Sequence, residues 1–86
     1  MGASRRQGVS RVHRPAYRRL CELLREWRKS AGLTQRDLAA KLKQPRSYVS
    51  KSEIAERRID PLELVIWCRT CGVEPVTAIR KVEKLV

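Results

Sequence analysis

The sequence is poor in aromatic residues: its 86 residues include two Trp, two Tyr and no Phe. A core built from this composition must be filled mainly by aliphatic side chains. Hydrophobic residues still make up 42% of the chain, which is enough for one modest core. Because a chain of this length is too short for a second independent fold, we predict a single folded domain.

Long apolar runs are also absent. No stretch of about 18 consecutive apolar residues occurs, so the sequence predicts no membrane-spanning helix. The Arg-rich start is not followed by the apolar segment of a secretory signal. We therefore expect an intracellular protein that does not act in a membrane.

Cysteine and histidine are too few to indicate a metal or catalytic site. The three cysteines, Cys21, Cys68 and Cys71, are an odd number, and an intracellular setting keeps thiols reduced. On a helix both sulfurs of the Cys68–Cys71 pair fall on the buried side, which favours core packing over metal binding. His13 has no catalytic partner nearby in sequence, and no Gly-rich phosphate loop is present. We expect no enzyme activity, no cofactor and no metal.

Acidic residues are scarce relative to basic ones. Nine Asp and Glu face 20 Lys and Arg, which gives a net charge of +11. A charge of this size attracts polyanions, so nucleic acid and anionic membrane surfaces are the candidate partners. Residues 1–14 contain no acid and few large apolar side chains, and we predict a flexible basic arm there. Its arginines either contact a duplex or only add nonspecific attraction; they are Arg5, Arg6, Arg11 and Arg14.

The remainder, residues 15–86, is predicted to form five short helices. Pro15 suits a first turn and Gly32 a helix end, and between them apolar residues recur at steps of three and four. These residues are Tyr17, Leu20, Cys21, Leu24, Trp27 and Ala31. Thr34 and Asp37 have the spacing of a capping box, which predicts a second helix over 35–42 with Leu38, Ala39 and Leu42 inward.

The later helices are marked by prolines. Pro45 breaks the second helix and opens a third over 46–54. Pro61 starts a fourth helix that Gly72 ends, and its predicted inward residues are Leu64, Trp67, Cys68 and Cys71. Pro75 starts a fifth, with Val76, Ile79, Val82 and Leu85 along one side. Helices joined by short connections, without an alternating strand pattern, predict an all-α, compact five-helix bundle.

The second and third helices have helix-turn-helix spacing, and here the sequence resembles the phage repressor and Cro-like, or XRE, family. The resemblance covers about residues 17–85. It rests on the runs RKSAGLTQRDLAAKL, QPRSYVSKSE, ERRIDPLEL and CGVEP. It implies a lambda-repressor-like DNA-binding domain, encoded by a bacterium or a phage and cytoplasmic.

The resemblance and the helix geometry together indicate candidate DNA contacts. If Val49 points to the core, the opposite face of the third helix carries the base-reading candidates Arg46, Ser47, Ser50 and Lys51. Arg46 is the first candidate for a guanine, because its guanidinium fork can bond both guanine acceptors. The family implies a phosphate contact by Gln35 at the start of the second helix. Further phosphate candidates are Lys43, Tyr48, Arg57 and Arg58.

Three residues depart from the family pattern, and one pair matches it. The family implies a partly buried ion pair between Arg28 and Glu53 that orients the third helix. Ser52 replaces a bulky apolar residue, which predicts a loosely packed or reoriented end of that helix. Ala55 and Lys43 replace glycines; a left-handed Lys43 costs roughly 1 kcal/mol, so we expect the turn to differ in detail.

We expect a sequence-specific transcriptional regulator, most simply a repressor, that binds double-stranded DNA as a homodimer. Two-fold pairing places two recognition helices about 34 to 36 Å apart on a palindrome. Candidate residues for the dimer surface are Val65, Ile66, Val82, Leu85 and Val86. Two alternatives stay open: an antitoxin-type module that binds a protein partner and represses its own promoter, and generic binding of RNA or anionic membranes by charge.

Overall fold

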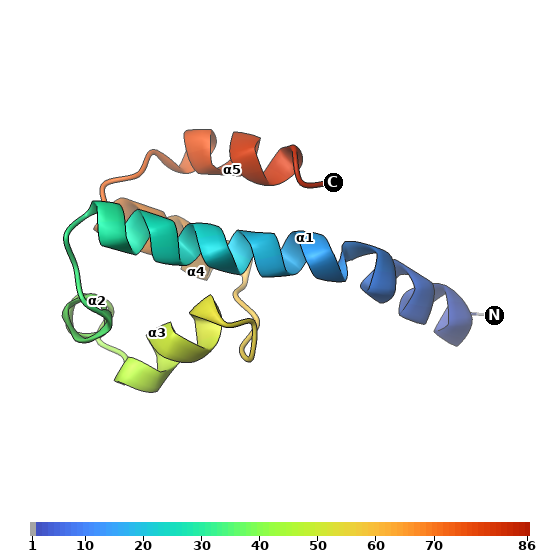
Figure 1. Ribbon diagram of the computed structural model, residues 1–86, viewed down its shortest axis with the longest axis horizontal. Helices are drawn as coiled ribbons and strands as arrows, with labels where there is room; N and C mark the ends of the chain where they lie inside the picture. The colour runs from blue at the N-terminus through green and yellow to red at the C-terminus, as the bar shows by residue number, and fades with distance from the viewer. Residues whose placement is uncertain (1) are drawn as a thin grey trace.

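The computed structural model describes the backbone of residues 2–86 and the side chains of residues 15–86. Within this part the chain forms five α-helices and no strand (Figure 1). The helices are α1 (Gly2–Ser30), α2 (Gln35–Leu42), α3 (Arg46–Glu53), α4 (Pro61–Thr70) and α5 (Pro75–Glu83). The predicted all-α class is confirmed, and α2, α3, α4 and α5 begin at the residues that the caps and prolines indicate.

Helix α1 is longer than the sequence predicts. Its backbone is helical from Gly2, whereas Pro15 was expected to start it, and Pro15 instead lies inside the helix. A proline removes one hydrogen bond of the helical ladder, and a long helix can continue through it. The side chains of residues 1–14 lie outside the described part, so the basic arm and its contacts with DNA stay a prediction.

The core is a cluster of aliphatic, Trp and Cys side chains between α1, α2, α3 and α4, and α5 contributes one residue to it. Trp67 of α4 is fully buried, and its Nε1 donates a hydrogen bond to the carbonyl oxygen of Leu24 in α1, at 3.1 Å. The indole is thus buried without an unsatisfied donor. The cluster consists of Leu23, Leu24, Trp27, Leu38, Ala39, Val49, Leu64, Trp67, Cys68, Cys71 and Ala78. Ala31, which the predicted stripe includes, is exposed because α1 ends before it.

The apolar side predicted for α5 covers the core only in part. Ala78 is its buried residue, and it was not on the predicted side. On the predicted apolar side, Val76 and Ile79 are 58% and 49% exposed, whereas Leu85 packs against the core. The packing of α5 against α4 fixes which flank is covered, and the small Ala78 side chain suits a close approach of two helices. Periodicity identifies an apolar side of a helix but not the neighbour that covers it.

The connections after α1, α2 and α4 share one backbone turn. In each, a residue with positive φ follows the helix: Gly32 (75°), Lys43 (56°) and Gly72 (73°). After α2, the amide of Gln44 donates to the carbonyl of Ala39 at 2.9 Å, and the other two turns have the corresponding bond. This is the Schellman arrangement, which satisfies carbonyls at the helix end. The expectation that Lys43 changes the turn is therefore wrong, because Lys43 adopts the left-handed conformation that the motif requires.

The left-handed backbone of Lys43 yields a stability prediction. We expect Lys43→Gly to raise the free energy of unfolding by up to about 1 kcal/mol, because glycine adopts positive φ without a Cβ clash. Lys41→Gly, in the last turn of α2, is the matched control and should lower the free energy of unfolding by roughly 0.5–1 kcal/mol. Urea denaturation of the two variants measures both effects. A loss of stability in Lys43→Gly would show that the lysine side chain contributes contacts which outweigh the strain.

Candidate nucleic-acid interface

A buried ion pair holds α3 against α1. The Arg28 Nε atom lies 2.6 Å from Glu53 Oε2, and its Nη2 lies 3.1 Å from Oε1, so the contact is bidentate. The two side chains are 9% and 1% exposed. Arg28 also donates through Nη1 to the carbonyl of Leu33, at 2.8 Å. The pair that the family resemblance implies is thus formed, and it joins the last turn of α1 to the last residue of α3.

Gln35 extends this network to α2. Its Nε2 donates to Glu53 Oε1 at 3.1 Å. Since a primary amide carries two N–H groups and a carbonyl oxygen, one N–H and the oxygen of Gln35 are left for other partners. From the family resemblance, Gln35 is expected to contact a phosphate. The structure adds a second task, because the same side chain ties the start of α2 to the end of α3.

The outward face of α3 has the composition expected for a recognition helix. Val49 is fully buried, whereas Arg46, Ser47 and Lys51 are exposed and Ser50 is half-buried. The Ser50 hydroxyl donates a long hydrogen bond of 3.4 Å to the carbonyl of Ser47. The predicted base-reading residues therefore share one accessible side of the helix, with two short side chains between two cations.

The far end of α3 is closed rather than loosely packed. Ser52 is fully buried, and its hydroxyl donates to the carbonyl of Tyr48 at 2.6 Å, one turn back. Ala55 takes the left-handed conformation (φ 64°) that its position requires, and the amide of Glu56 bonds to the carbonyl of Lys51. The expected loosening at Ser52 is wrong, because its hydroxyl is hydrogen-bonded to the backbone and its side chain is fully buried.

Tyr48 and Arg57, both predicted phosphate contacts, face α4. The Arg57 guanidinium lies 4.1 Å from the centre of the Tyr48 ring, and its Nη2 lies 2.6 Å from Glu63 Oε2. Tyr48 is half-buried and packs against the core. A contact of Arg57 with a phosphate would have to compete with this pair. The two residues thus have a structural task that spacing alone did not indicate.

Tyr17 of α1 fixes the loop between α3 and α4. Its hydroxyl accepts a hydrogen bond from the amide of Ile59 at 2.9 Å and donates one to the carbonyl of Arg57 at 3.2 Å. The guanidinium of Arg58 lies 4.9 Å from the centre of the Tyr17 ring. Sequence reasoning assigned Tyr17 to the apolar stripe and did not identify this role. The signal available in the sequence was the position of Tyr17, a residue with a polar hydroxyl, at the first position of that stripe.

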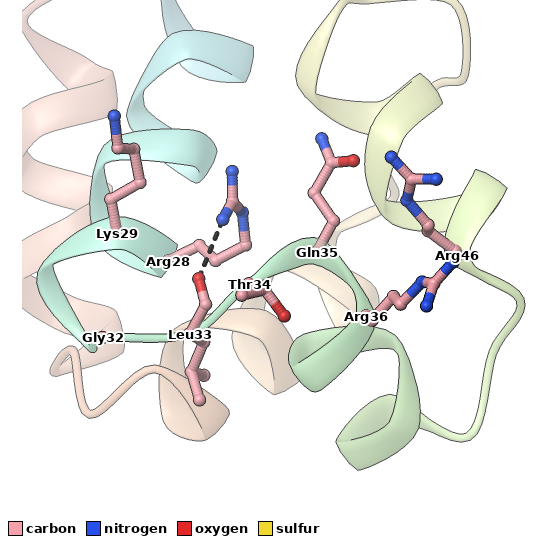
Figure 2. Close-up of a pocket in the computed structure, with 8 residues that line it drawn as sticks. All are labelled: Arg28, Lys29, Gly32, Leu33, Thr34, Gln35, Arg36 and Arg46. Atoms are coloured by element: carbon pink, nitrogen blue, oxygen red, sulfur yellow. Dashed lines mark hydrogen bonds between the residues drawn. The ribbon is translucent and has the colours of Figure 1, made fainter.

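An open groove of about 590 Å³ lies where α1, α2 and α3 meet. Figure 2 shows the side chains of Gln35 and Arg46 pointing into the same space, and Arg36 reaching from α2 toward the start of α3. The groove is lined by Arg28, Lys29, Gly32, Leu33, Thr34, Gln35, Arg36 and Arg46. Four of these eight residues are cationic, and among the described lining residues none is acidic. Sequence reasoning missed Lys29 and Arg36, although both are cations within the motif that carries the resemblance.

The remaining candidates are distributed over the surface. Lys43 lies in the turn between α2 and α3, Arg58 lies in the loop after α3, and both are exposed. Of the predicted dimer residues, Ile66 is 53% and Val86 78% exposed, whereas the other three are half-buried. No helix in the described part of the chain has the length and apolarity to cross a bilayer.

The cysteines lie in the core. Burial raises the pKa of Cys68 and of Cys71 to about 11, and it also raises the pKa of Cys21. All three therefore remain protonated thiols at neutral pH, and a thiol is a poor nucleophile and metal ligand. The packing role predicted for the Cys68–Cys71 pair fits this environment.

Comparisons with known proteins agree on one family. The helix-turn-helix family model matches residues 24–77 of the chain. A solved structure of an XRE-family like protein from Pseudomonas syringae pv. tomato str. DC3000 is 42% identical in sequence and superposes with a TM-score of 0.83. The match covers 92% of this chain and 96% of that one. A search of curated proteins found no match.

The ion pair between Arg57 and Glu63 yields a pH prediction. Its hydrogen bonds, with that from the Asp60 amide, lower the pKa of Glu63 from 4.5 to about 2. A depressed folded-state pKa stabilises the fold above the unfolded value, and this contribution is lost as pH falls from about 4.5 to about 2. We expect Glu63→Gln to be less stable than the parent at pH 6, with the difference shrinking toward pH 2. Thermal unfolding across this range tests it; a pH-independent difference would contradict the linkage.

Proposed function

Since the chain belongs to the XRE family of helix-turn-helix proteins, which are DNA-binding transcription regulators, we propose that it is a repressor that reads an operator with α3. One observation carries this proposal. The buried pair of Arg28 and Glu53 holds α3 so that its polar, cationic side faces outward. A helix presented in this way fits the major groove of B-DNA, which admits an α-helix.

In the proposed complex, α3 reads base edges and its neighbours hold the backbone. Arg46, in the first turn of α3, donates both arms of its fork to a guanine, and Lys51 reaches a second base. The short hydroxyls of Ser47 and Ser50 allow close approach. Gln35 uses its remaining N–H, with the free amides at the start of α2, to bind a phosphate.

Exposed cations on both sides of α3 complete the backbone contacts. Lys43 follows α2 and Arg58 follows α3, and both are exposed. Each phosphate contact releases condensed counterions, so affinity should fall steeply with salt. These contacts position the protein but carry no sequence information.

We further propose that the repressor binds as a homodimer. One α3 contacts only a few base pairs, and a two-fold axis doubles the site. The candidate surface includes Ile66 on α4 and Val86 at the end of the chain, both large apolar residues that are more than half exposed. Burying these side chains against a second protomer is favourable, because it removes apolar surface from contact with water.

We expect Arg46→Ala to weaken binding to the operator far more than binding to random duplex. The loss should amount to about 1–3 kcal/mol for each half-site, the usual discrimination of a bidentate contact with guanine. Selection from a random DNA pool supplies the operator, and titration at fixed salt measures both affinities. Arg69→Ala on α4, exposed and outside the groove, is the matched control for charge. Equal losses on both duplexes would show that Arg46 contacts only backbone.

For the dimer, we expect Ile66→Asp to dissociate the protein into monomers at micromolar concentration, because the carboxylate would be desolvated in the interface. Val76→Asp on α5, equally exposed but outside the proposed surface, should leave the dimer intact. Sedimentation velocity distinguishes the two states. A parent protein that stays monomeric both alone and on the operator would exclude the dimer, and a dimer that persists in Ile66→Asp would exclude this surface.

A further inference from the structure

Arg36 is an exposed cation that the proposed DNA contacts do not use. It is the second residue of α2, and it lines the same groove as Arg46, the first residue of α3. In Figure 2 its side chain extends from α2 in the direction of the start of α3. The ion pairs formed within residues 15–86 involve only other residues, with Arg19, Arg28 and Arg57 as the cations. Neither Arg36 nor Arg46 is therefore neutralised in this part of the protein.

Glu53 and Asp37, the two acidic residues that bond to residues lining this groove, are already engaged. Glu53 is paired with Arg28 and accepts from Gln35. Asp37 accepts from the amide of Thr34 at 2.9 Å, which lowers the pKa of its carboxyl group. Adjacent positions on a helix do not face each other, so Asp37 is not placed to neutralise Arg36. Two guanidinium groups thus share the groove without an anion between them.

The start of α3 adds to this positive potential. Pro45 precedes the helix and supplies no side-chain cap, and the first turn contains no acidic residue. The amino end of a helix carries a partial positive charge from its free amides. In α2 and α4, by contrast, capping boxes place Asp37 and Glu63 in the first turn. The end of α3 that Arg36 approaches therefore favours an anion more than the corresponding ends of α2 and α4.

We propose that Arg36 binds the DNA-backbone phosphate that flanks the base pair contacted by Arg46. This inference rests on the proposed function, because it assumes that α3 enters the major groove. In a helix-turn-helix complex the first helix of the unit crosses the backbone while the second enters the groove. A cation on α2 that reaches the start of α3 then meets the phosphate at the groove edge. A guanidinium suits this partner, since it can donate two parallel hydrogen bonds to phosphate oxygens.

The contact also gives Arg36 a positioning role. With a phosphate bound to Arg36, the repulsion between the two guanidinium groups is screened locally, and the Arg46 side chain is free to extend toward the base. Without it, Arg46 competes for that phosphate. Arg36 thus helps to set the depth and direction at which α3 lies in the groove, and it does not itself read sequence.

The first test compares Arg36→Ala with Arg69→Ala on the selected operator and on random duplex of the same length. A phosphate contact with this positioning role predicts that Arg36→Ala weakens both complexes, the operator complex by the larger factor, and reduces the salt slope by about one for each protomer. Arg69→Ala should leave the slope unchanged, and Arg36→Lys should restore most of it. A loss confined to the operator would overturn the proposal, because it would make Arg36 a base reader. An unchanged slope would overturn it as well.

The second test locates the phosphate. Operator duplexes that each carry one uncharged methylphosphonate are titrated with the parent protein and with Arg36→Ala. We expect one position in each half-site at which neutralisation weakens the parent but not the variant, beside the base pair at which Arg46→Ala loses discrimination. If the two proteins respond alike at every position, Arg36 binds no phosphate.

The outcomes distinguish this inference from the function on which it rests. If Arg46→Ala lost equal affinity for operator and random duplex, Arg46 would not read a base. A methylphosphonate position specific to Arg36 would still be detected in that case. Conversely, Arg46→Ala can lose affinity for the operator alone while Arg36→Ala binds like the parent. In that case the proposed function holds and the phosphate contact of Arg36 is overturned. Circular dichroism confirms folding of each variant, and both side chains are exposed, so truncation leaves the core unchanged.

Discussion

The buried pair of Arg28 and Glu53 is the interaction on which the rest of the arrangement depends. It lies where α1, α2 and α3 converge, because Glu53 also accepts from Gln35 and Arg28 also donates to the carbonyl of Leu33. Transferring two charges into a low-dielectric core is costly, and removing one partner of such a pair typically destabilises a protein by about 3–5 kcal/mol. The pair matters more for the orientation of α3 than for stability. Bidentate bonds allow few relative orientations of α1 and α3, so the pair sets how α3 faces solvent.

The loop that follows α3 is held by a second, separate group of contacts. Arg57 bridges the Tyr48 ring and Glu63, and the Tyr17 hydroxyl bonds to two backbone groups of the loop. Together with the ion pair, these contacts connect α3 to both α1 and α4. A recognition surface fixed in this way before binding loses little conformational entropy when it meets a rigid duplex. The same contacts reduce the number of cations available for phosphates, since Arg57 is engaged within the protein.

The structure also shows how departures from a family pattern are accommodated. Lys43 and Ala55 occupy left-handed positions where glycine is favoured, and each accepts backbone strain so that the turn is kept. Ser52 replaces a bulky side chain, and its hydroxyl bonds one turn back to Tyr48. In each case the backbone path is maintained, because the surrounding helix contacts outweigh a local penalty of about 1 kcal/mol.

From the sequence by itself one can determine the helix-turn-helix unit, since its signals are local. The same holds for the other helix ends: the capping residue Thr34, the prolines at 45, 61 and 75, and the glycines at 32 and 72 act through the backbone within a few residues of their own position. Apolar periodicity likewise identified Leu24, Leu38, Val49 and Trp67 as core residues. Only the tertiary structure decided the flank of α5 that is covered, the use of Arg57 as an internal contact, and the groove that Arg36 and Arg46 both line. These depend on which helices become neighbours, and neighbours distant in sequence leave no trace in local spacing.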